Sequence, residues 1–354
     1  MFREPLSILI VDDSALMRNL ISRIFEDVPD INVAGTAING KFALQKIDHL
    51  NPDVIILDLE MPEMNGIEFL KERRKRGIKV PVIILSSQAV KGARITIEAL
   101  ELGASDFVLK PSGSVSHDIY KTKEELVELV RFFGGKYRKS KFPAPEKEAV
   151  AYEKHEIRQP AGKTRIDIIA VGISTGGPNA LRHVLPRLSP QLPVPVLIVQ
   201  HMPPGFTREF AENLNKICPL KVKEAEEGDS IVKGSVFIAP GDYHMEVTSG
   251  STENHIHLSD APPVNGHRPS ADVLFTSVAK TYASHTLAII MTGMGKDGAR
   301  EIGRIYSMGG VTFAQDEESS VVFGMPKAAI ENGTISRIVP LDRMAASINE
   351  AVMA

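Results

Sequence analysis

Residues 166–178 read Ile-Asp-Ile-Ile-Ala-Val-Gly-Ile-Ser-Thr-Gly-Gly-Pro, and this stretch decides how the second half of the chain is interpreted. Its apolar start predicts a buried strand, its glycines a sharp turn, and Pro178 the first turn of a helix. Ser174 lies at the apex of the turn, in the spelling Gly-x-Ser-x-Gly. Small residues are needed there because the chain reverses sharply and the N–H groups beside the serine must reach a substrate oxygen. The stretch therefore predicts a serine displayed at the end of a strand.

The rest of the second half continues the alternation of strands and helices. Further buried strands are expected at 194–199, 286–291 and 311–314, with helices at 207–217, 271–282 and near 326–332. Residues 221–258 differ, because their short alternating runs and glycine turns predict an antiparallel hairpin region laid onto the parallel sheet. The fold expected for residues 166–354 is a doubly wound, Rossmann-like α/β domain with this hairpin insertion.

Three chemically active side chains follow expected strand ends in this half: Ser174, His201 and Asp297. In an open parallel sheet such strand ends share one edge. A serine hydroxyl keeps its proton at neutral pH, so a histidine must take that proton and a carboxylate must orient the imidazole and stabilise its charge. The pattern predicts a Ser-His-Asp site, in a chain order unlike that of the familiar hydrolases. Each residue also has a structural alternative: a turn serine, a satisfied loop histidine, and an aspartate that caps the helix it opens.

The first half contains five repeats of strand and helix, which predict a flavodoxin-like, doubly wound parallel sheet. The ends of its expected strands carry Asp12, Asp13, Asp58, Ser86 and Lys110. Three carboxylates at one edge repel each other unless a divalent cation holds them, and hard oxygen ligands favour Mg²⁺. A hydroxyl and an ammonium group opposite them are suited to gripping a phosphoryl group. The alternative is a set of ordinary solvated loop residues.

Between the two halves, residues 134–165 lose the apolar periodicity and contain glycines, basic residues and prolines. We expect a charged, flexible linker there, either a plain tether or a partner-binding segment, between domains at 1–133 and 166–354. The chain has 354 residues, a net charge of −3 and a single cysteine, Cys218. These values argue against non-specific nucleic-acid binding and fit a reducing compartment. We find no secretory signal and no apolar run near the roughly 18 residues of a membrane span, so a cytoplasmic protein without membrane insertion is expected.

The five strand-end residues of the first half resemble those of a response-regulator receiver domain. The resemblance implies that Asp58 is the phospho-acceptor, Ser86 the switch hydroxyl and Lys110 the lysine that pairs with the phosphate. It further implies Mg²⁺ at Asp12, Asp13 and Asp58, with Asp13 as a direct ligand and Asp12 acting through water. A chemotaxis histidine kinase is the implied phosphodonor.

Four motifs of the second half resemble the chemotaxis protein-glutamate methylesterase family: Gly-Ile-Ser-Thr-Gly-Gly-Pro, Gln-His-Met-Pro, His-Arg-Pro-Ser-Ala-Asp-Val-Leu-Phe and Thr-Gly-Met-Gly-x-Asp-Gly. The resemblance implies hydrolysis of glutamate methyl esters on chemoreceptor cytoplasmic domains, deamidation of selected glutamines, and activation by phosphorylation, giving sensory adaptation. Ser174 is then the nucleophile, His201 the base and later the acid, and Asp297 the residue that orients it. The backbone N–H groups near Thr175 and Met294 form the implied oxyanion hole. No cofactor is implied in this domain.

Three points stay open at this stage. Arg268 either pairs with receptor carboxylates or forms a structural salt bridge. The 172–177 loop has an alternative function as a nucleotide-phosphate site of an output kinase or reductase, although no Gly-Lys-Ser/Thr follows it. The second domain has a further alternative function as a partner-binding module with an inert serine.

Overall fold

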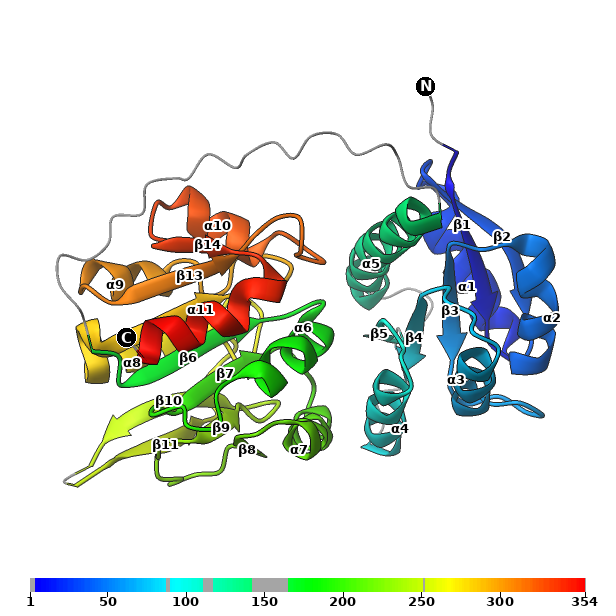
Figure 1. Ribbon diagram of the computed structural model, residues 1–354. Coiled ribbons are helices and arrows are strands. Elements are labelled where there is room, and N and C mark those ends of the chain that lie inside the picture. The colour runs from blue at the N-terminus through cyan, green and yellow to red at the C-terminus, as the bar shows by residue number, and fades with distance from the viewer. Residues whose placement is uncertain (1–3, 87–89, 111–116, 142–164, 251, 354) are drawn as a thin grey trace. The chain divides into compact units, whose positions relative to one another are not determined.

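The chain divides into two compact units, Met1–Tyr152 and Glu153–Ala354, in the computed structural model (Figure 1). The structure describes residues 4–86, 90–110, 117–141, 165–250 and 252–353. Among these residues, no helix is both long enough and apolar enough to cross a membrane. Most of the expected linker, residues 142–164, lies outside the described residues, and the expected domain boundaries remain predictions.

The N-terminal unit is built on a five-stranded parallel sheet. Its strands are β1 (Leu6–Val11), β2 (Ile31–Ala37), β3 (Val54–Asp58), β4 (Val82–Ser86) and β5 (Asp106–Leu109). Its helices are α1 (Ala15–Glu26), α2 (Gly40–Leu50), α3 (Gly66–Lys75), α4 (Val90–Glu101) and α5 (His117–Lys141). The strand order β2-β1-β3-β4-β5 is the flavodoxin-like order, which confirms the expected fold. The carboxyl ends of β1, β3, β4 and β5 therefore meet at one edge.

Helix α5 is longer than the sequence indicated. The linker is predicted to begin at residue 134, but the helix continues to Lys141. Arg138, in its last turn, forms an ion pair with the buried carboxylate of Asp53 and donates to the carbonyl of Pro5 over 2.7 Å. A glycine such as Gly134 is unfavourable in a helix interior, but here a Cβ would lie 2.9 Å from a methyl carbon of Val54. Tertiary contacts therefore extend the helix through residues whose composition favours a linker.

The C-terminal unit is built on a seven-stranded sheet in the order β14-β13-β12-β6-β7-β9-β8, and all its strand pairs are parallel. Its strands are β6 (Ile168–Ile173), β7 (Val196–Gln200), β8 (Lys221–Glu224), β9 (Ser235–Ile238), β12 (Thr286–Ile290), β13 (Val311–Gln315) and β14 (Arg337–Val339). Its helices are α6 (Gly177–Val184), α7 (Phe206–Ile217), α8 (Ala271–Tyr282), α9 (Glu301–Ser307), α10 (Met325–Glu331) and α11 (Leu341–Met353), with short 3₁₀ turns η1 (Leu185–Arg187) and η2 (Ala283–His285).

The 221–258 region differs in detail from its expected arrangement. β8 and β9 join the large sheet as parallel strands, because residues 225–234 return the chain to the starting edge. β10 (His244–Ser249) and β11 (Asn254–Ser259) pair antiparallel and form a separate two-stranded sheet, and Ser230 adds one antiparallel bridge to His255. The doubly wound fold with an antiparallel hairpin is confirmed. The hairpin covers residues 244–259, however, and not the whole predicted region 221–258.

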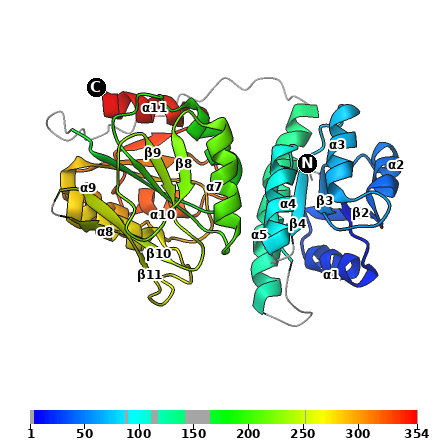
Figure 2. The ribbon, with the colours of Figure 1, turned by 90° about the horizontal axis from the view of Figure 1, so that it is seen from below.

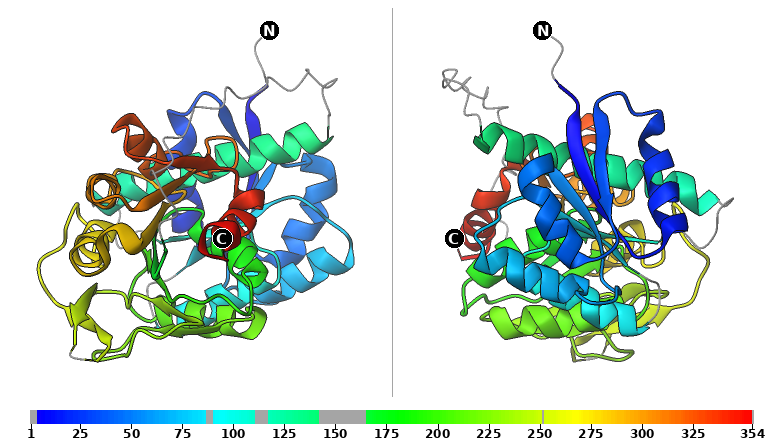
Figure 3. Two further views of the ribbon diagram at one scale, coloured as in Figure 1. Left: turned by 60° about the vertical axis from the view of Figure 1, so that its left-hand side comes forward. Right: turned by 90° about the vertical axis from the view of Figure 1, so that its right-hand side faces the viewer.

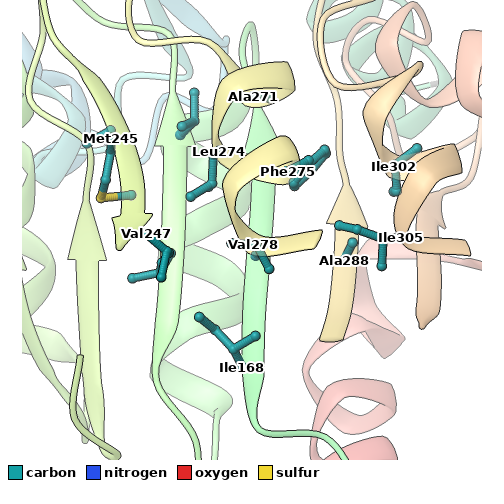
Figure 4. Packing of buried hydrophobic residues seen from close by; sticks show 14 of the residues in the cluster. Ile168, Met245, Val247, Ala271, Leu274, Phe275, Val278, Ala288, Ile302 and Ile305 are labelled. Carbon is teal, nitrogen blue, oxygen red and sulfur yellow. The ribbon is translucent and has the colours of Figure 1, made fainter. Parts of the chain in front are cut away.

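Helices cover both faces of the large sheet. α6, α7 and α11 lie on one face and α8, α9 and α10 on the other, as right-handed crossovers in two directions from β6 require (Figures 2 and 3). Figure 4 shows how α8 is fixed: Phe275 and Val278 lie over β6 and β12, while Leu274 lies on the side of Met245 and Val247 from the hairpin strand β10. This packing determines where the N-terminus of α8 lies, and that helix end forms part of the site described below.

Candidate active site and acidic pocket

The strand register brings the predicted Ser174 and His201 to neighbouring positions. Ile173 at the end of β6 pairs with Gln200 at the end of β7, so the two residues follow directly from paired positions. The backbone N–H of His201 donates to the carbonyl of Ile173 over 3.2 Å. The backbone N–H of Ser174 donates to the carbonyl of Thr292, beyond the end of β12, over 2.9 Å. Three loops are therefore joined at the carboxyl edge of the sheet, as expected.

Close packing around Ser174 leaves no room for a side chain at Gly176 in its own turn or at Gly293 in the neighbouring loop. Gly176 has a φ of +82°, and a Cβ there would lie 2.4 Å from a methyl carbon of Val321. Gly293 in the neighbouring loop lies so close that its Cβ would be 2.7 Å from the Cβ of Ser174. Since real Cβ atoms do not approach other atoms this closely, neither position has space for a residue larger than glycine. Ser174 itself is buried, with 9% of its surface exposed.

His201 and Asp297 form a direct hydrogen bond. Nε2 of His201 lies 2.9 Å from Oδ2 of Asp297, with side-chain exposures of 8% and 0%. Nδ1 of His201 is also buried, and among the described residues it has no hydrogen-bond partner. The carboxylate fixes the tautomer in which Nε2 carries the proton, so Nδ1 has a lone pair available to accept a proton.

Asp297 accepts hydrogen bonds from several further donors. The hydroxyl of Ser270 donates over 2.6 Å, the amide of Asn265 over 3.0 Å, and the backbone N–H of Ala271 at the start of α8 over 2.6 Å. Burial alone would raise the pKa of Asp297, but the hydrogen bonds from His201, Ser270 and Asn265 and the charge of His201 hold that pKa well below its usual value. The carboxylate is therefore ionised at neutral pH.

This network differs from the structural alternatives considered for the same residues. Asp297 does not cap the helix that follows it, since α9 begins at Glu301; it accepts from the N-terminus of α8 instead. Ser270 occupies the N-cap position of α8, but its side chain makes no capping bond and donates to Asp297. The ionised carboxylate of Asp297 stabilises the N-terminus of α8 instead of a capping side chain at Ser270.

Thr175 and Met294 lie in the two loops that flank Ser174. The hydroxyl of Thr292 donates to the carbonyl of Thr175 over 2.8 Å, which ties the serine turn to the β12 loop. The carbonyl of Gly293, just before Met294, accepts from Gly324 and from Met325, the first residue of α10. Both predicted oxyanion-hole residues are therefore held at the edge that carries Ser174, and their role remains a prediction.

Arg268 is engaged in the structure. Its Nη2 lies 2.6 Å from Oδ1 of Asp242, and its Nη1 donates to the carbonyls of Asp260 and Ala261 over 2.7 and 3.2 Å. These contacts correspond to the structural salt bridge that was one of its two expected roles. They anchor the loop that contains His267 and Ser270.

Sequence reasoning missed Asn265 and His267 as members of the site. Residues 264–267 form a tight turn in which Val264 and His267 exchange backbone hydrogen bonds of 3.0 and 2.9 Å. Asn265 and Gly266 both have positive φ, 53° and 79°, as a type I′ turn requires. The Asn-Gly pair was the available signal, because it marks such a turn, but it does not reveal what the turn contacts.

The five residues predicted in the N-terminal unit lie at the carboxyl edge of its sheet, and four of them are in direct proximity to one another. Asp12, Asp13 and Asp58 each place a carboxylate oxygen within 4.8 Å of the others. Nζ of Lys110 lies 2.8 Å from Asp58 and 3.0 Å from Asp12. Burial and the charge of Asp12 raise the pKa of Asp58 despite Lys110, while Asp58 and Asp12 raise the pKa of Lys110 despite its burial. The convergence of three carboxylates fits a hard divalent cation such as Mg²⁺.

Ser86, the fifth of these residues, lines one pocket together with Asp58, Lys110 and Gly92. Its hydroxyl lies 2.6 Å from the hydroxyl of the buried Thr96 in α4. Thr96 donates its own proton to the carbonyl of Gly92 over 2.7 Å, so Ser86 is the donor in the Ser86–Thr96 bond. The predicted switch hydroxyl is therefore bonded to α4 in this state.

Comparisons with known proteins match both units. Residues 169–348 match the CheB methylesterase family and residues 8–117 match the response regulator receiver domain. A protein-glutamate methylesterase/protein-glutamine glutaminase of Treponema denticola is 50% identical over 364 residues, covering 98% of each chain. The protein of that name from Bacillus subtilis is 45% identical over 350 residues, again covering 98% of each. The crystal structure of the Thermotoga maritima CheB methylesterase catalytic domain aligns with a TM-score of 0.51 at 39% identity, covering 52% of this chain and 98% of that one.

Proposed function

The chain belongs to the protein-glutamate methylesterase/protein-glutamine glutaminase family, with a receiver domain and a methylesterase domain, and from this premise we propose that Ser174, His201 and Asp297 perform its hydrolysis. The protein demethylates glutamate methyl esters, deamidates glutamines, and acts in phosphorylation-regulated chemotaxis adaptation. Family membership sets aside the nucleotide-dependent enzyme and the inert binding module. The observation that carries the proposal is the buried His201–Asp297 hydrogen bond beside the Ser174 turn.

In the first step, the hydroxyl oxygen of Ser174 attacks the carbonyl carbon of the methyl ester while Nδ1 of His201 takes the hydroxyl proton. The imidazolium is stabilised by Asp297, which stays ionised because its pKa is low. The carbon–oxygen bond to the methoxy group breaks, and His201 returns the proton to release methanol. With a glutamine substrate the leaving group is ammonia. The backbone N–H groups near Thr175 and Met294 are the proposed donors to the oxyanion.

In the second step, water attacks the acyl-enzyme carbonyl as Nδ1 of His201 takes a proton from that water. The bond to Ser174 breaks, His201 returns the proton to the serine oxygen, and the receptor glutamate is released. Both steps use one base and one orienting carboxylate, so a single site accounts for esterase and deamidase activity. The proposed substrates are the cytoplasmic domains of chemoreceptors.

A serine-reactive phosphonate tests this assignment directly. Incubation of the full chain with the phosphonate should attach one adduct to the peptide that contains Ser174 and stop methanol release from methylated receptor. Mass spectrometry locates the adduct, and gas chromatography follows the methanol. An adduct on another serine, with methanol release lost, would assign the reaction elsewhere.

In the receiver domain, we propose that Asp58 accepts a phosphoryl group from a chemotaxis histidine kinase. Asp12, Asp13 and Asp58 would hold the Mg²⁺, which supplies charge neutralisation for phosphoryl transfer. Lys110, bonded to Asp58 and Asp12, is placed to pair with the added phosphate oxygens. Ser86 is proposed to move from Thr96 to the phosphoryl group.

Phosphorylation of Asp58 should depend on the cation. We expect acyl-phosphate formation from a small phosphodonor to fall roughly 100-fold or more in EDTA, because a metal contributes several kcal/mol of charge stabilisation. Asp58→Asn should form none, whereas Asp48→Asn, which alters an exposed aspartate on α2, should behave as the natural chain does. Intact-mass measurement with and without chelator checks this. Equal phosphorylation in EDTA would rule out the proposed metal role.

A further inference from the structure

The ring of His201 is contacted on one face as well as at one edge. The imidazole of His267 lies parallel to it, with ring centroids 3.9 Å apart and planes 8° from parallel. The bond to Asp297 fixes the position of Nε2 but leaves the ring free to swing about that bond. We propose that His267 is a positioning residue that fixes the plane of the His201 ring, and with it the direction in which the proton-accepting Nδ1 points. This inference rests on the proposed role of His201 as the base.

His267 is itself held on both sides along the chain. On one side, the type I′ turn ties it to Val264 through two backbone hydrogen bonds, and Asn265 in that turn bonds to both Asp272 and Asp297 over 2.8 and 3.0 Å. On the other side, Arg268 is fixed by Asp242 and by two carbonyls. Residues 265–268 therefore contact both the ring of His201, through His267, and the carboxylate of Asp297, through Asn265. This one segment fixes the position of the ring relative to the carboxylate.

The proposed role of His267 depends on the flat shape of its ring. Two parallel rings 3.9 Å apart are in van der Waals contact over their faces, so a tilt of His201 toward His267 meets atoms at once. A branched aliphatic side chain offers no such plane. An aromatic ring without titratable nitrogen offers the same plane and removes any acid–base role of the residue. A comparison of phenylalanine with leucine at position 267 therefore distinguishes two roles: positioning of His201 by a flat ring, and acid–base chemistry of the His267 imidazole.

The experiment measures methanol release from methylated receptor by the full chain carrying His267→Ala, His267→Leu or His267→Phe. We expect alanine and leucine to lower kcat roughly 10- to 100-fold with KM little changed, because a small displacement of a reacting group is sufficient for such a loss. His267→Phe should remain within about threefold of the natural chain, since the plane is kept. Thermal unfolding of each variant identifies one that loses activity by failing to fold, and the leucine–phenylalanine pair then carries the comparison.

A second readout does not depend on turnover. Nitrogen-15 NMR of the imidazoles should show His201 in one tautomer, protonated at Nε2, in the natural chain and in His267→Phe. In His267→Leu the same tautomer should remain, because the bond to Asp297 is kept, but the ring signals of His201 should broaden as the ring swings about that bond. The proposal is overturned if leucine keeps the natural kcat, or if phenylalanine is as impaired as leucine, which would assign the role to the imidazole itself. Failure of the proposed function is distinct, because Ser174→Ala would then still release methanol.

Discussion

Replacing Ser174 with alanine is expected to lower methanol release from methylated receptor by about 10⁴- to 10⁶-fold, the scale seen when a serine nucleophile is removed from a triad. The substitution removes only the attacking oxygen. The backbone of residue 174 keeps its bonds to Thr292, to Gly177 and to the side-chain amide of Gln200, because all three involve main-chain atoms. The tight approach of Gly293 to the Cβ is also unchanged. Activity should therefore disappear without loss of the fold.

A serine of similar size elsewhere in the domain provides the matched control. Ser307 is exposed near the end of α9, where its hydroxyl donates to the carbonyl of Arg304. Ser307→Ala should keep the natural rate and the natural unfolding temperature. The phosphonate should label this control variant and leave Ser174→Ala unlabelled. Retention of more than about 1% of the natural rate by Ser174→Ala would contradict its role as nucleophile, since a triad without its serine retains far less.

Asp297→Asn should lower both activity and stability. An asparagine amide donates where the carboxylate accepted, so it favours the wrong tautomer of His201, a change associated with losses of about 10⁴ in kcat. The amide also faces the donors Ser270, Asn265 and the N–H of Ala271, and it cannot accept from all of them. Buried donors left unsatisfied cost about 1–3 kcal/mol, which corresponds to roughly 2–4 °C in unfolding temperature per kcal/mol for a domain of this size.

Stability as a function of pH gives this prediction a second test. Because its folded-state pKa lies below the ordinary value of 3.8, Asp297 contributes stability that is present above pH 3.8 and is lost as pH falls through the folded-state pKa. The difference in unfolding free energy between the natural chain and Asp297→Asn should therefore be constant near neutrality and narrow below pH 3.8. Asp229→Asn is the control, since that carboxylate pairs with Lys223 and accepts from Glu226 away from the site. Full activity in Asp297→Asn would reduce Asp297 to a structural role.

Much of the site could be predicted because its members follow short apolar strands. The runs before Ser174 and His201 are wholly buried in the structure, and a buried parallel strand is recognised by such a run. Parallel strands have their carboxyl ends at the same edge of the sheet. The proximity of Ser174 and His201 could therefore be predicted from their positions directly after two such strands. The same reasoning placed Asp58 and Lys110 in one pocket.

Other features depend on contacts that a local pattern does not contain. The turn at Asn265 was readable as a turn, but its bonds to Asp297 span 32 residues. The stacking of His267 on His201 depends on the packing of α8 and its preceding loop against the sheet. The continuation of α5 to Lys141 depends on Arg138 reaching Asp53, 85 residues earlier. The helix α5 is extended by tertiary contacts against its local composition. The 264–267 turn takes part in the site only through contacts with residues distant in sequence.

If Ser86 is the switch hydroxyl, as proposed above, its hydrogen bond to Thr96 has a consequence for the activity of the unphosphorylated protein. A receiver whose Ser86 turns to a phosphoryl group on Asp58 gives up this bond, while Thr96 keeps its bond to Gly92. One such bond contributes about 0.5–1.5 kcal/mol, which is roughly a two- to thirteenfold weighting between two populations. The weighting favours the unswitched population whenever phosphate is absent. With Ser86 in that role, the two hydroxyl groups would help to keep activity low before phosphorylation, so that the added phosphate produces a larger relative change.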